Sequence, residues 1–520
     1  MTRKFITTMR RMPYRFFIAK SISITRYLRC VTILICALYF LLIPSIQLVG
    51  YLRDPGLANG SMCSFLYQWH RGLSTKYEIW AQERLASNKA AQLSYENISG
   101  TEWPLFGSVF YLWATESLQA AWEANPDLYA VAPVDYAKGA IEASTALVAD
   151  TAHASWVKQH WGEKYLEKEN LFYRMLLIHA MISYQKLLND NHYEPLLIQQ
   201  VNSLSQELDA SPYGLLDDYP GQCYPVDIIP AYAAIQRADA LLGLDHSSVI
   251  KRGIRAFQDN RLDSNTGLPA YNVDSETGYR LGPARGVGMS FMLIWAPELW
   301  PDSAFEWYRN YEQHFWKNTR LLAGFREFSF SSAAGNRWII EVDAGPVMAG
   351  YGMGASAFGI GAARANGRMD HAYPLSALAL TGAWRLPDGT LPIPRLLSDT
   401  IDAPYLGEAA IVFSLTRMPV SAVITKSEGR IPWLVFLILG SVIIIGLYLW
   451  VSSIIEIKRV WTGIDPYVIP LAGFQLAVRV LLLATAVFAF FTYGSFIGQL
   501  ALIIALTFPY IQKKIKPGAN

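Results

Sequence analysis

The chain has few residues of the types that most often hold metals or form redox centres. It contains 4 cysteines and 8 histidines in 520 residues, with no Cys-x-x-Cys pair and no metal-ligand spacing. The sequence therefore predicts no metal site and excludes a zinc ribbon or thioredoxin-like centre. Cys63 and Cys223 fall in the large central segment, where one disulfide and two separate thiols both remain open.

Charge is also scarce, and it is balanced. The chain carries 44 Lys and Arg residues against 42 Asp and Glu residues, which gives no drive toward nucleic acid. It has no Gly-rich phosphate loop and no basic stripe interleaved with aromatic residues. We therefore expect no nucleic-acid partner.

Long uncharged runs, in contrast, are prominent. A helix needs about 20 apolar residues to cross roughly 30 Å of hydrocarbon. The sequence predicts four transmembrane helices: one over residues 31–52, one over residues 431–455, and a hairpin of two over residues 470–512 that turns at Tyr493-Gly494. Arg479 is interpreted as a side chain that reaches toward the lipid headgroups. The lipid bilayer is thus an expected partner.

Basic clusters flank these runs and predict their orientation. Residues 1–30 contain eight Lys and Arg residues and no acid, and Lys458 and Arg459 follow the second run. Positive clusters stay in the cytoplasm, so residues 54–429 are expected outside it. An uncleaved anchor is favoured over a signal peptide, because no small-x-small cleavage pattern follows the first run. The predicted location is a bacterial-type inner (cytoplasmic) membrane, multi-pass, with the main domain on the periplasmic or extracellular side.

Helical periodicity recurs through residues 54–429, so the predicted class is all-α. About a dozen helices in hairpins suggest an (α/α)6 toroid or barrel whose inner helices surround a funnel. Small β-hairpins are expected at its rim, at residues 271–279 and 337–343. The predicted helical windows are 76–98, 105–122, 134–150, 166–187, 196–208, 225–242, 247–260, 284–299, 302–320, 346–366, 370–384 and 405–417.

Three stretches carry candidate catalytic acids. Glu102 lies between turn formers beside apolar residues, which raise a carboxyl pKa and suit a general acid. Asp217 belongs to the acidic, aromatic loop of residues 214–227, and Asp343 ends a strand-like run. Helix capping is the alternative role for Glu102 and the loop aspartates. The expected substrate-binding residues are Trp103, Asp218, Tyr219, Gln222, Cys223, Tyr224, Asp227 and Tyr271.

Together these stretches resemble the linalool dehydratase/isomerase domain family over most of residues 75–385. The matching features are Ala91-Gln-Leu-Ser-Tyr95 leading to Glu102, Glu167-Lys-Glu-Asn170 with Tyr173, Asp217 with Gln222-Cys223, Asp343-Ala-Gly345, and the Ala355-Ser-Ala-Phe358 helix. The resemblance implies an (α/α)6 barrel and cofactor-free loss or migration of water on an allylic alcohol. By position, Glu102 stands for the family's aspartate, Asp217 for its glutamate, and Cys223 for an active-site cysteine.

The sequence departs from that family at three places. The family's histidine falls on Leu176, its cysteine before the acid falls on Leu216, and its tyrosine/cysteine cluster is not reproduced at residues 103–109. These departures weigh against terpene chemistry, whereas a mechanism with two carboxylates survives them.

Three functions follow as hypotheses. The leading one is a membrane-anchored hydro-lyase or isomerase that acts on a small apolar alcohol. The first alternative is an inverting glycoside hydrolase, or another glycan-active enzyme of the cell envelope, because helical toroids also host such enzymes. The second alternative is a non-catalytic binding scaffold. The oligomeric state stays open.

Overall fold

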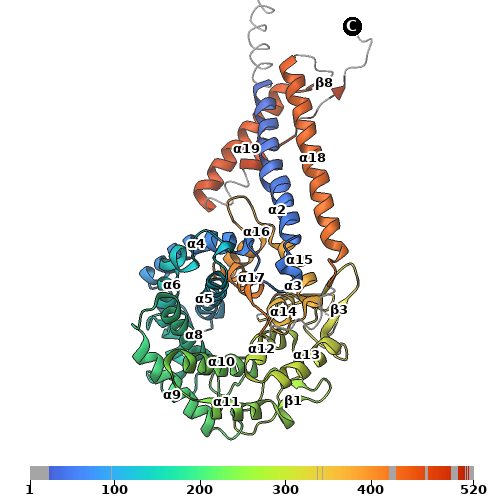
Figure 1. The fold of residues 1–520 in the computed structure, drawn as a ribbon. Helices are drawn as coiled ribbons and strands as arrows, with labels where there is room; N and C mark the ends of the chain where they lie inside the picture. The colour runs from blue at the N-terminus through green and yellow to red at the C-terminus, as the bar shows by residue number, and fades with distance from the viewer. Residues whose placement is uncertain are drawn as a thin grey trace, which may run out of the picture. The chain divides into compact units, whose positions relative to one another are not determined.

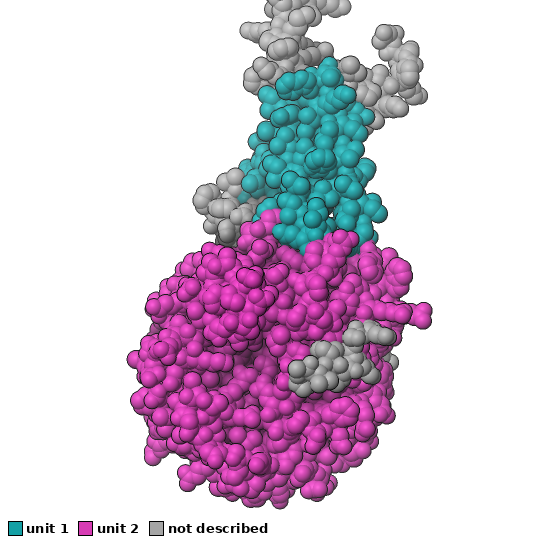
Figure 2. Space-filling view, viewed as in Figure 1, with its two compact units in different colours: residues 1–47, 438–520 teal, residues 48–437 magenta. Residues whose placement is uncertain are grey.

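The computed structural model describes residues 23–94, 96–335, 338–341, 343–420, 429–462, 467–493, 502–509, 511 and 513–514. These residues are mostly helical with a few short strands, as expected for an all-α chain. The chain divides into two compact units, residues 1–47 with 438–520 and residues 48–437 (Figure 2). The basic segment before residue 23, Tyr95 and residues 494–501 of the expected hairpin lie outside the described residues.

Two helices are long and apolar enough to cross a bilayer. They are Ser23–Leu52, which includes a π-helical stretch at Ala37–Leu42 before α2 (Ile43–Leu52), and α18 (Trp433–Thr462). Both coincide with predicted spans. Within the first unit, Arg26 of one helix pairs with Glu456 of the other, with 2.9 Å between Arg26 Nε and Glu456 Oε1. The same unit holds α19 (Ala472–Tyr493) and the pair β8 (Tyr467–Val468) and β9 (Lys513–Lys514).

Residues 48–437 form most of the helices. They are α3 (Pro55–Asn59), α4 (Phe65–Ser87), α5 (Ile98–Ala124), α6 (Pro133–Ala149), α7 (Ser155–Trp161), α8 (Leu171–Leu188), α9 (Glu194–Ala210), α10 (Pro225–Leu242), α11 (Ser247–Gly253), α12 (Gly286–Leu299), α13 (Pro301–Phe315), α14 (Met353–Ala365), α15 (Met369–Ala383), α16 (Pro392–Thr400) and α17 (Leu406–Thr416).

Contacts between these helices follow a regular order (Figure 1). Helix α5 contacts α8, and the series continues through α10, α12, α14 and α17, which contacts α5 again. Helices α6, α9, α11, α13 and α15 each pack against members of this closed series. Aromatic side chains of the series pack together in the core: Phe110 stacks on Phe413 at 5.5 Å between ring centroids, and Trp113 lies 4.6 Å from Trp295.

Helix α5 contains a proline whose cost is offset locally. Asn97 caps its start by accepting a hydrogen bond from the Gly100 backbone N–H at 3.0 Å. Pro104 cannot donate to the Gly100 carbonyl, four residues earlier, because it has no N–H. The Arg84 guanidinium donates to that carbonyl instead. The helix can therefore continue through Pro104.

Short antiparallel strands occupy the connections. Strand β1 (Leu262–Asp263) pairs with β2 (Leu268–Pro269), β3 (Trp316–Asn318) pairs with β4 (Ala323–Phe325), and β5 (Ile339–Glu341), β6 (Gly345–Met348) and β7 (Tyr351–Gly352) form a three-stranded sheet. The expected strand at residues 337–343 is thus confirmed at β5. The helix predicted from residue 346 was wrong at its start: residues 345–352 pair as β6 and β7, and α14 begins at Met353.

The second expected hairpin, at residues 271–279, was only partly right. Val273 forms isolated bridges to Cys223 and to Arg280, and no paired strand of two or more residues is assigned within this described segment.

The backbone at the first residue of α12, Gly286, closely approaches the backbone of residues 326–327. The Gly286 N–H donates to the Glu327 carbonyl at 2.8 Å, and a Cβ at Gly286 would meet the Arg326 carbonyl oxygen at 1.9 Å. Only glycine fits at this first residue of α12.

Candidate functional site

Acidic side chains gather where helices of the closed series begin. Glu102 lies in the second turn of α5, and Asp227 is the third residue of α10. Asp218 lies beside the start of α8, and Asp343 occupies the turn between β5 and β6, just before α14. The charges of Glu102 and Asp343 both act on Asp227, so segments far apart in the sequence meet at one site.

Glu102 has the environment of a proton donor. Burial raises the pKa of its carboxyl group to about 7; the Tyr219 hydroxyl opposes part of this rise, and the charge of Asp343 adds to it. The Tyr219 hydroxyl is itself buried and has no hydrogen-bond partner of ordinary geometry among the described residues. A carboxyl group with a pKa near 7 can donate a proton at neutral pH. Because Asn97 caps α5 and Glu102 lies inside that helix, the alternative that Glu102 is a cap was wrong.

Asp217 holds its loop in shape. One carboxylate oxygen accepts a hydrogen bond from the Gly221 N–H at 2.7 Å, and the other accepts one from the Ser275 hydroxyl at 2.6 Å. Its backbone carbonyl accepts from the Leu171 N–H, at the first residue of α8, at 3.1 Å. Gly221 closes this turn with φ of +75°, which favours glycine. Both oxygens of Asp217 therefore serve local structure.

Asp218 and Asp227 are buried acids with unfilled hydrogen-bonding capacity. One oxygen of Asp218 accepts from the Tyr224 N–H at 2.8 Å, and the other is buried without a partner among the described residues. The Asp227 carboxyl group forms no hydrogen bond with another described side chain. Burial raises both pKa values well above the usual range, and the charge of Asp227 adds to the effect on Asp218. The pair therefore binds protons that exposed aspartates would release.

Cys223 lies among these aspartates as an inert thiol. It is 1% exposed, and both Cys63 and Cys223 are free cysteines. Burial raises the pKa of the Cys223 thiol well above its ordinary value, and the charges of Asp218 and Asp217 add to this. A thiol that stays protonated is a poor nucleophile, so packing is its evident role here.

Asp343 differs from the other acids because it is exposed. It accepts a hydrogen bond from the Tyr271 hydroxyl. The Arg285 guanidinium lies 4.7 Å from the Tyr271 ring centroid and donates to the buried Glu327 carboxylate at 2.8 Å. Arg285 also pairs with Glu341. These contacts connect the start of α12 to the β5–β6 turn and support the position of Tyr271.

An aromatic surface lies next to Glu102. Phe106, one turn further along α5, stacks on Phe172 of α8 at 5.1 Å, and Phe172 lies 6.3 Å from the Tyr219 ring. Phe106 also lies 6.0 Å from Phe291 of α12. The carboxyl groups thus border an apolar region, which is the physical cause of the raised pKa of Glu102.

Most of the expected site residues meet in this region. Tyr224 is half-buried; burial raises its pKa, and the charges of Asp343 and Asp218 contribute, so it lies among the acids. Its hydroxyl donates to exposed Gln222 at 3.0 Å. Trp103 is half-buried in α5. Sequence reasoning missed three residues of the region, Phe172, Arg285 and Glu327, because no motif or spacing distinguishes them.

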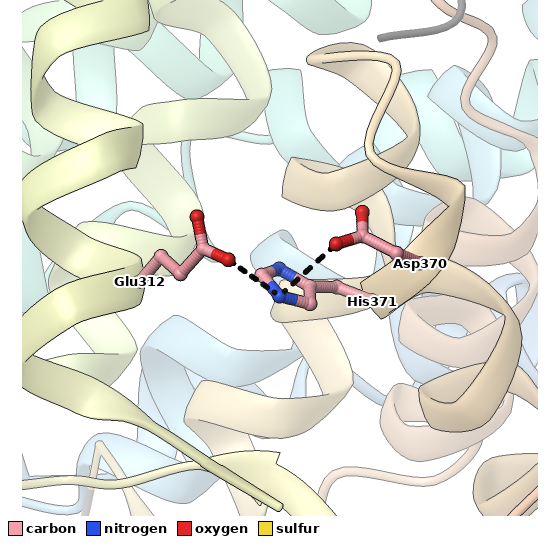
Figure 3. Close-up of side chains that lie close together, drawn as sticks. All are labelled: Glu312, Asp370 and His371. Carbon is pink, nitrogen blue, oxygen red and sulfur yellow. Dashed lines mark ion pairs between the residues drawn. The ribbon is translucent and has the colours of Figure 1, made fainter. Parts of the chain in front are cut away.

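One group of ligand-type side chains, Glu312, Asp370 and His371, lies together elsewhere in the described residues (Figure 3). His371 Nε2 is 3.4 Å from Glu312 and 3.6 Å from Asp370. The Arg368 guanidinium already fills this space: it reaches both Glu312 oxygens at 2.8 and 2.7 Å and both Asp370 oxygens at 2.9 and 2.8 Å. Because the Arg368 guanidinium is the cation between the two carboxylates, this group is a structural ion-pair network and not a metal centre.

No family model matches the chain, and no characterised protein matches it either.

Proposed function

We propose that residues 48–437 form a cofactor-independent acid–base enzyme that removes or moves the hydroxyl group of an alcohol, as a hydro-lyase or isomerase. The observation that carries the proposal is the Glu102 carboxyl group, whose pKa is raised to about 7 beside the buried acid Asp227 and an aromatic surface. The resemblance to the linalool dehydratase/isomerase family points to the same chemistry.

In the proposed reaction, protonated Glu102 donates its proton to the substrate hydroxyl. The carbon–oxygen bond breaks, and water leaves with the bonding electrons. The ionised form of Asp227, which its raised pKa makes a stronger base than an ordinary carboxylate, then takes a proton from the neighbouring carbon, and that C–H electron pair forms the double bond. Transfer of this proton back to Glu102 restores the starting state. For migration of the hydroxyl group, water adds back at the other end of the allylic system.

The base in this proposal is Asp227 and not Asp217. Asp217 and Asp343 were the two expected candidates for the base, but both oxygens of Asp217 accept hydrogen bonds, from Gly221 and Ser275. The Asp227 carboxyl group has no such partner among the described residues, and the charge of Glu102 acts on it. Asp343 is retained as a third acid that holds Tyr271.

We also propose the finer architecture. The closed order of contacts from α5 to α17 supports an (α/α)6 barrel whose acids lie at one mouth. Together with Ser23–Leu52 and Trp433–Thr462, the apolar α19 region supports a chain with four spans. The basic clusters favour an inner membrane with the barrel outside the cytoplasm.

Cysteine labelling tests that orientation. The exposed position Asn265 belongs to the barrel, and the exposed position Thr462 ends α18. In intact spheroplasts, a membrane-impermeant maleimide should label the N265C variant at once and the T462C variant only after lysis. Labelling of T462C alone in intact cells would contradict the orientation.

Product analysis tests the chemistry. The detergent-purified full chain should be incubated with a panel of allylic alcohols and, separately, with envelope glycans. Alkene or isomerised alcohol should form with the wild type and be lost in Glu102→Gln and Asp227→Asn. A scaffold without catalysis would give no product with any substrate.

Inverting glycoside hydrolysis is the second candidate. It is favoured by one observation: the charge of exposed Asp343 raises the pKa of the half-buried Glu102 carboxyl group, and an inverting enzyme needs one protonated acid and one solvated base. Release of sugars with inverted configuration, without turnover of the alcohols, would select it over the hydro-lyase.

A further inference from the structure

A separate cavity of about 300 Å³ lies within residues 48–437. Its walls come from α4, the 389–391 connection, α16, Tyr405 and α17, and none of its lining residues belongs to the acidic site. The residues that give it chemical character are Trp69, Lys76, Arg395, Tyr405 and Glu408; the other lining residues are mainly apolar or glycine. Its volume is at the small end of the range for ligand sites, roughly 300–1,000 Å³.

Two buried nitrogen atoms of this lining have no acceptor. Trp69 is 4% exposed, and its Nε1 has no hydrogen-bond partner among the described residues; the same holds for Arg395 Nη1. Buried donors without partners are rare in folded proteins, because each loses its hydrogen bonds to water. Both donors lie on the wall of one cavity and can therefore donate to a ligand bound there.

The charged donors are held in place. The Arg395 guanidinium stacks 3.8 Å from the Tyr405 ring centroid, and its Nε donates to Asp399 at 2.8 Å. Lys76 Nζ donates to the Thr390 hydroxyl at 3.0 Å and keeps further protons for a ligand. Two cationic side chains and one indole N–H thus face one small space.

Glu408 does not oppose an anion as strongly as an ordinary carboxylate. It is 5% exposed, and it accepts a hydrogen bond from the Ser398 hydroxyl at 3.2 Å. Burial raises the pKa of Glu408 to about 7. In its protonated form it is a fourth donor to a ligand oxygen.

We propose that this cavity binds a phosphate ester, with Lys76, Arg395 and Trp69 as donors to the phosphate oxygens. Phosphate suits the lining because it accepts several charge-assisted hydrogen bonds at once. The apolar wall of Leu73, Leu391 and Val412 suits the organic part of an ester. The site is independent of the proposed alcohol chemistry.

The ester has two sources, a phospholipid headgroup and a free phosphate metabolite. The Trp69 ring lies 5.6 Å from the ring of Tyr51, in the last turn of the helix Ser23–Leu52 that is apolar enough to span a membrane. This neighbour is consistent with a lipid, and the test compares both sources.

The test measures binding to the detergent-purified full chain by calorimetry and by the shift in thermal unfolding. The probes are inorganic phosphate, glycerol 3-phosphate and short-chain phosphatidic acid. The variants are Lys76→Gln, Arg395→Gln and Trp69→Phe; the last keeps an aromatic ring, although a smaller one, and removes the indole N–H. Lys89→Gln is the matched control, because Lys89 pairs with Asp402 at 2.6 Å and does not line the cavity.

At least one probe should bind the wild type and the Lys89→Gln variant equally. Lys76→Gln and Arg395→Gln should each weaken binding about tenfold or more, and Trp69→Phe several-fold. Binding of the lipid alone identifies a headgroup site, and binding of the two soluble probes identifies a metabolite site. Failure of all three probes to bind the wild type, or equal binding by the folded cavity variants, would overturn the proposal.

Discussion

The hydroxyl of Tyr271 donates a hydrogen bond to the carboxylate of Asp343. The bond joins the connection after β2 to the β5–β6 turn, and the Arg285 guanidinium lies against the Tyr271 ring at 4.7 Å. Asp343 in turn acts on the pKa of Glu102 and of Asp227. An exposed acid is thereby linked to half-buried Glu102 and to buried Asp227.

Removal of that hydroxyl should affect function more than folding. Tyr271→Phe keeps the ring contact with Arg285 and loses the bond to Asp343. The free energy of unfolding should fall by only about 1 kcal/mol, since the bond is exposed. Turnover of the substrate found in the panel should fall about tenfold. Denaturant titration and initial rates measure the two effects; unchanged turnover would remove Asp343 from the mechanism.

Glu102→Gln should separate catalysis from stability. Loss of a general acid should lower turnover by about a hundredfold or more. Wild-type turnover that needs protonated Glu102 should itself fall as pH rises through about 7.

The same substitution, which lowers turnover, should raise the free energy of unfolding at high pH. Because the folded-state pKa of Glu102, about 7, lies above its ordinary value of 4.5, its contribution to stability is fully present below pH 4.5 and lost as pH rises through 7. The free energy of unfolding of the Glu102→Gln variant should therefore exceed that of the wild type by about 1–3 kcal/mol at pH 8, and the two should be equal near pH 4. Unfolding titrations at both pH values decide this; a variant less stable at pH 8 contradicts it.

Asp217→Asn and Asp227→Asn form a matched pair of variants. An amide in place of Asp217 can accept only one of the two hydrogen bonds from Gly221 and Ser275, so stability should fall by about 1–3 kcal/mol. Asp227→Asn removes a buried acid without such bonds, so the fold should persist while turnover is lost. Melting curves and rates for both variants check this; the reverse pattern would return the base role to Asp217.

Replacement of Arg368 should convert its ion-pair network into a metal site. Arg368→Ala leaves the Glu312 and Asp370 carboxylates without their cation, which should cost about 3–5 kcal/mol of stability. The ligand atoms of Glu312, Asp370 and His371 lie within 4.8 Å of one another, so Zn²⁺ should bind this variant and restore part of its melting temperature. The wild type should show no such shift. Equal Zn²⁺ effects on both proteins would contradict this.

The Arg26–Glu456 pair should behave as a buried ion pair between two helices. The side chains are 7% and 10% exposed. Arg26→Gln or Glu456→Gln alone should each lower stability by roughly 3 kcal/mol, and the double variant should lose less than the sum, because neither charge is then left alone. Thermal unfolding of the single and double variants in detergent measures the coupling free energy between Arg26 and Glu456. Strictly additive losses of stability would contradict the prediction.

Comparison of the predicted helical windows with the helices of the structure shows where helical periodicity is enough to predict a helix and its ends. The window 225–242 coincides with α10, and the window 134–150 is within one residue of α6 at each end. In both cases Pro lies in the first turn, which marks the start locally. The window 76–98 was displaced from α4, because that helix begins at Phe65 directly after a short connection and ends where Asn88 adopts positive φ.

The sequence by itself determined the helical class, two apolar spans, the short strand near residue 340, and the loop position of Asp217 and Asp218, although Glu102 and Asp227 lie within α5 and α10. These follow from patterns within a few residues: periodicity, uncharged length, and turn formers beside carboxylates.

Only the tertiary structure decided which acids have their oxygens hydrogen-bonded by their own loop. Asp217 and Asp227 look alike in sequence, yet one has both oxygens bonded and the other is buried without a partner among the described residues. Trp69 and Arg395 line one cavity although they are 326 residues apart in the chain, and Arg285 pairs with Glu327 across 42 residues. Hydrogen-bond partners and desolvation depend on the packing of distant segments, and local patterns carry no information about them.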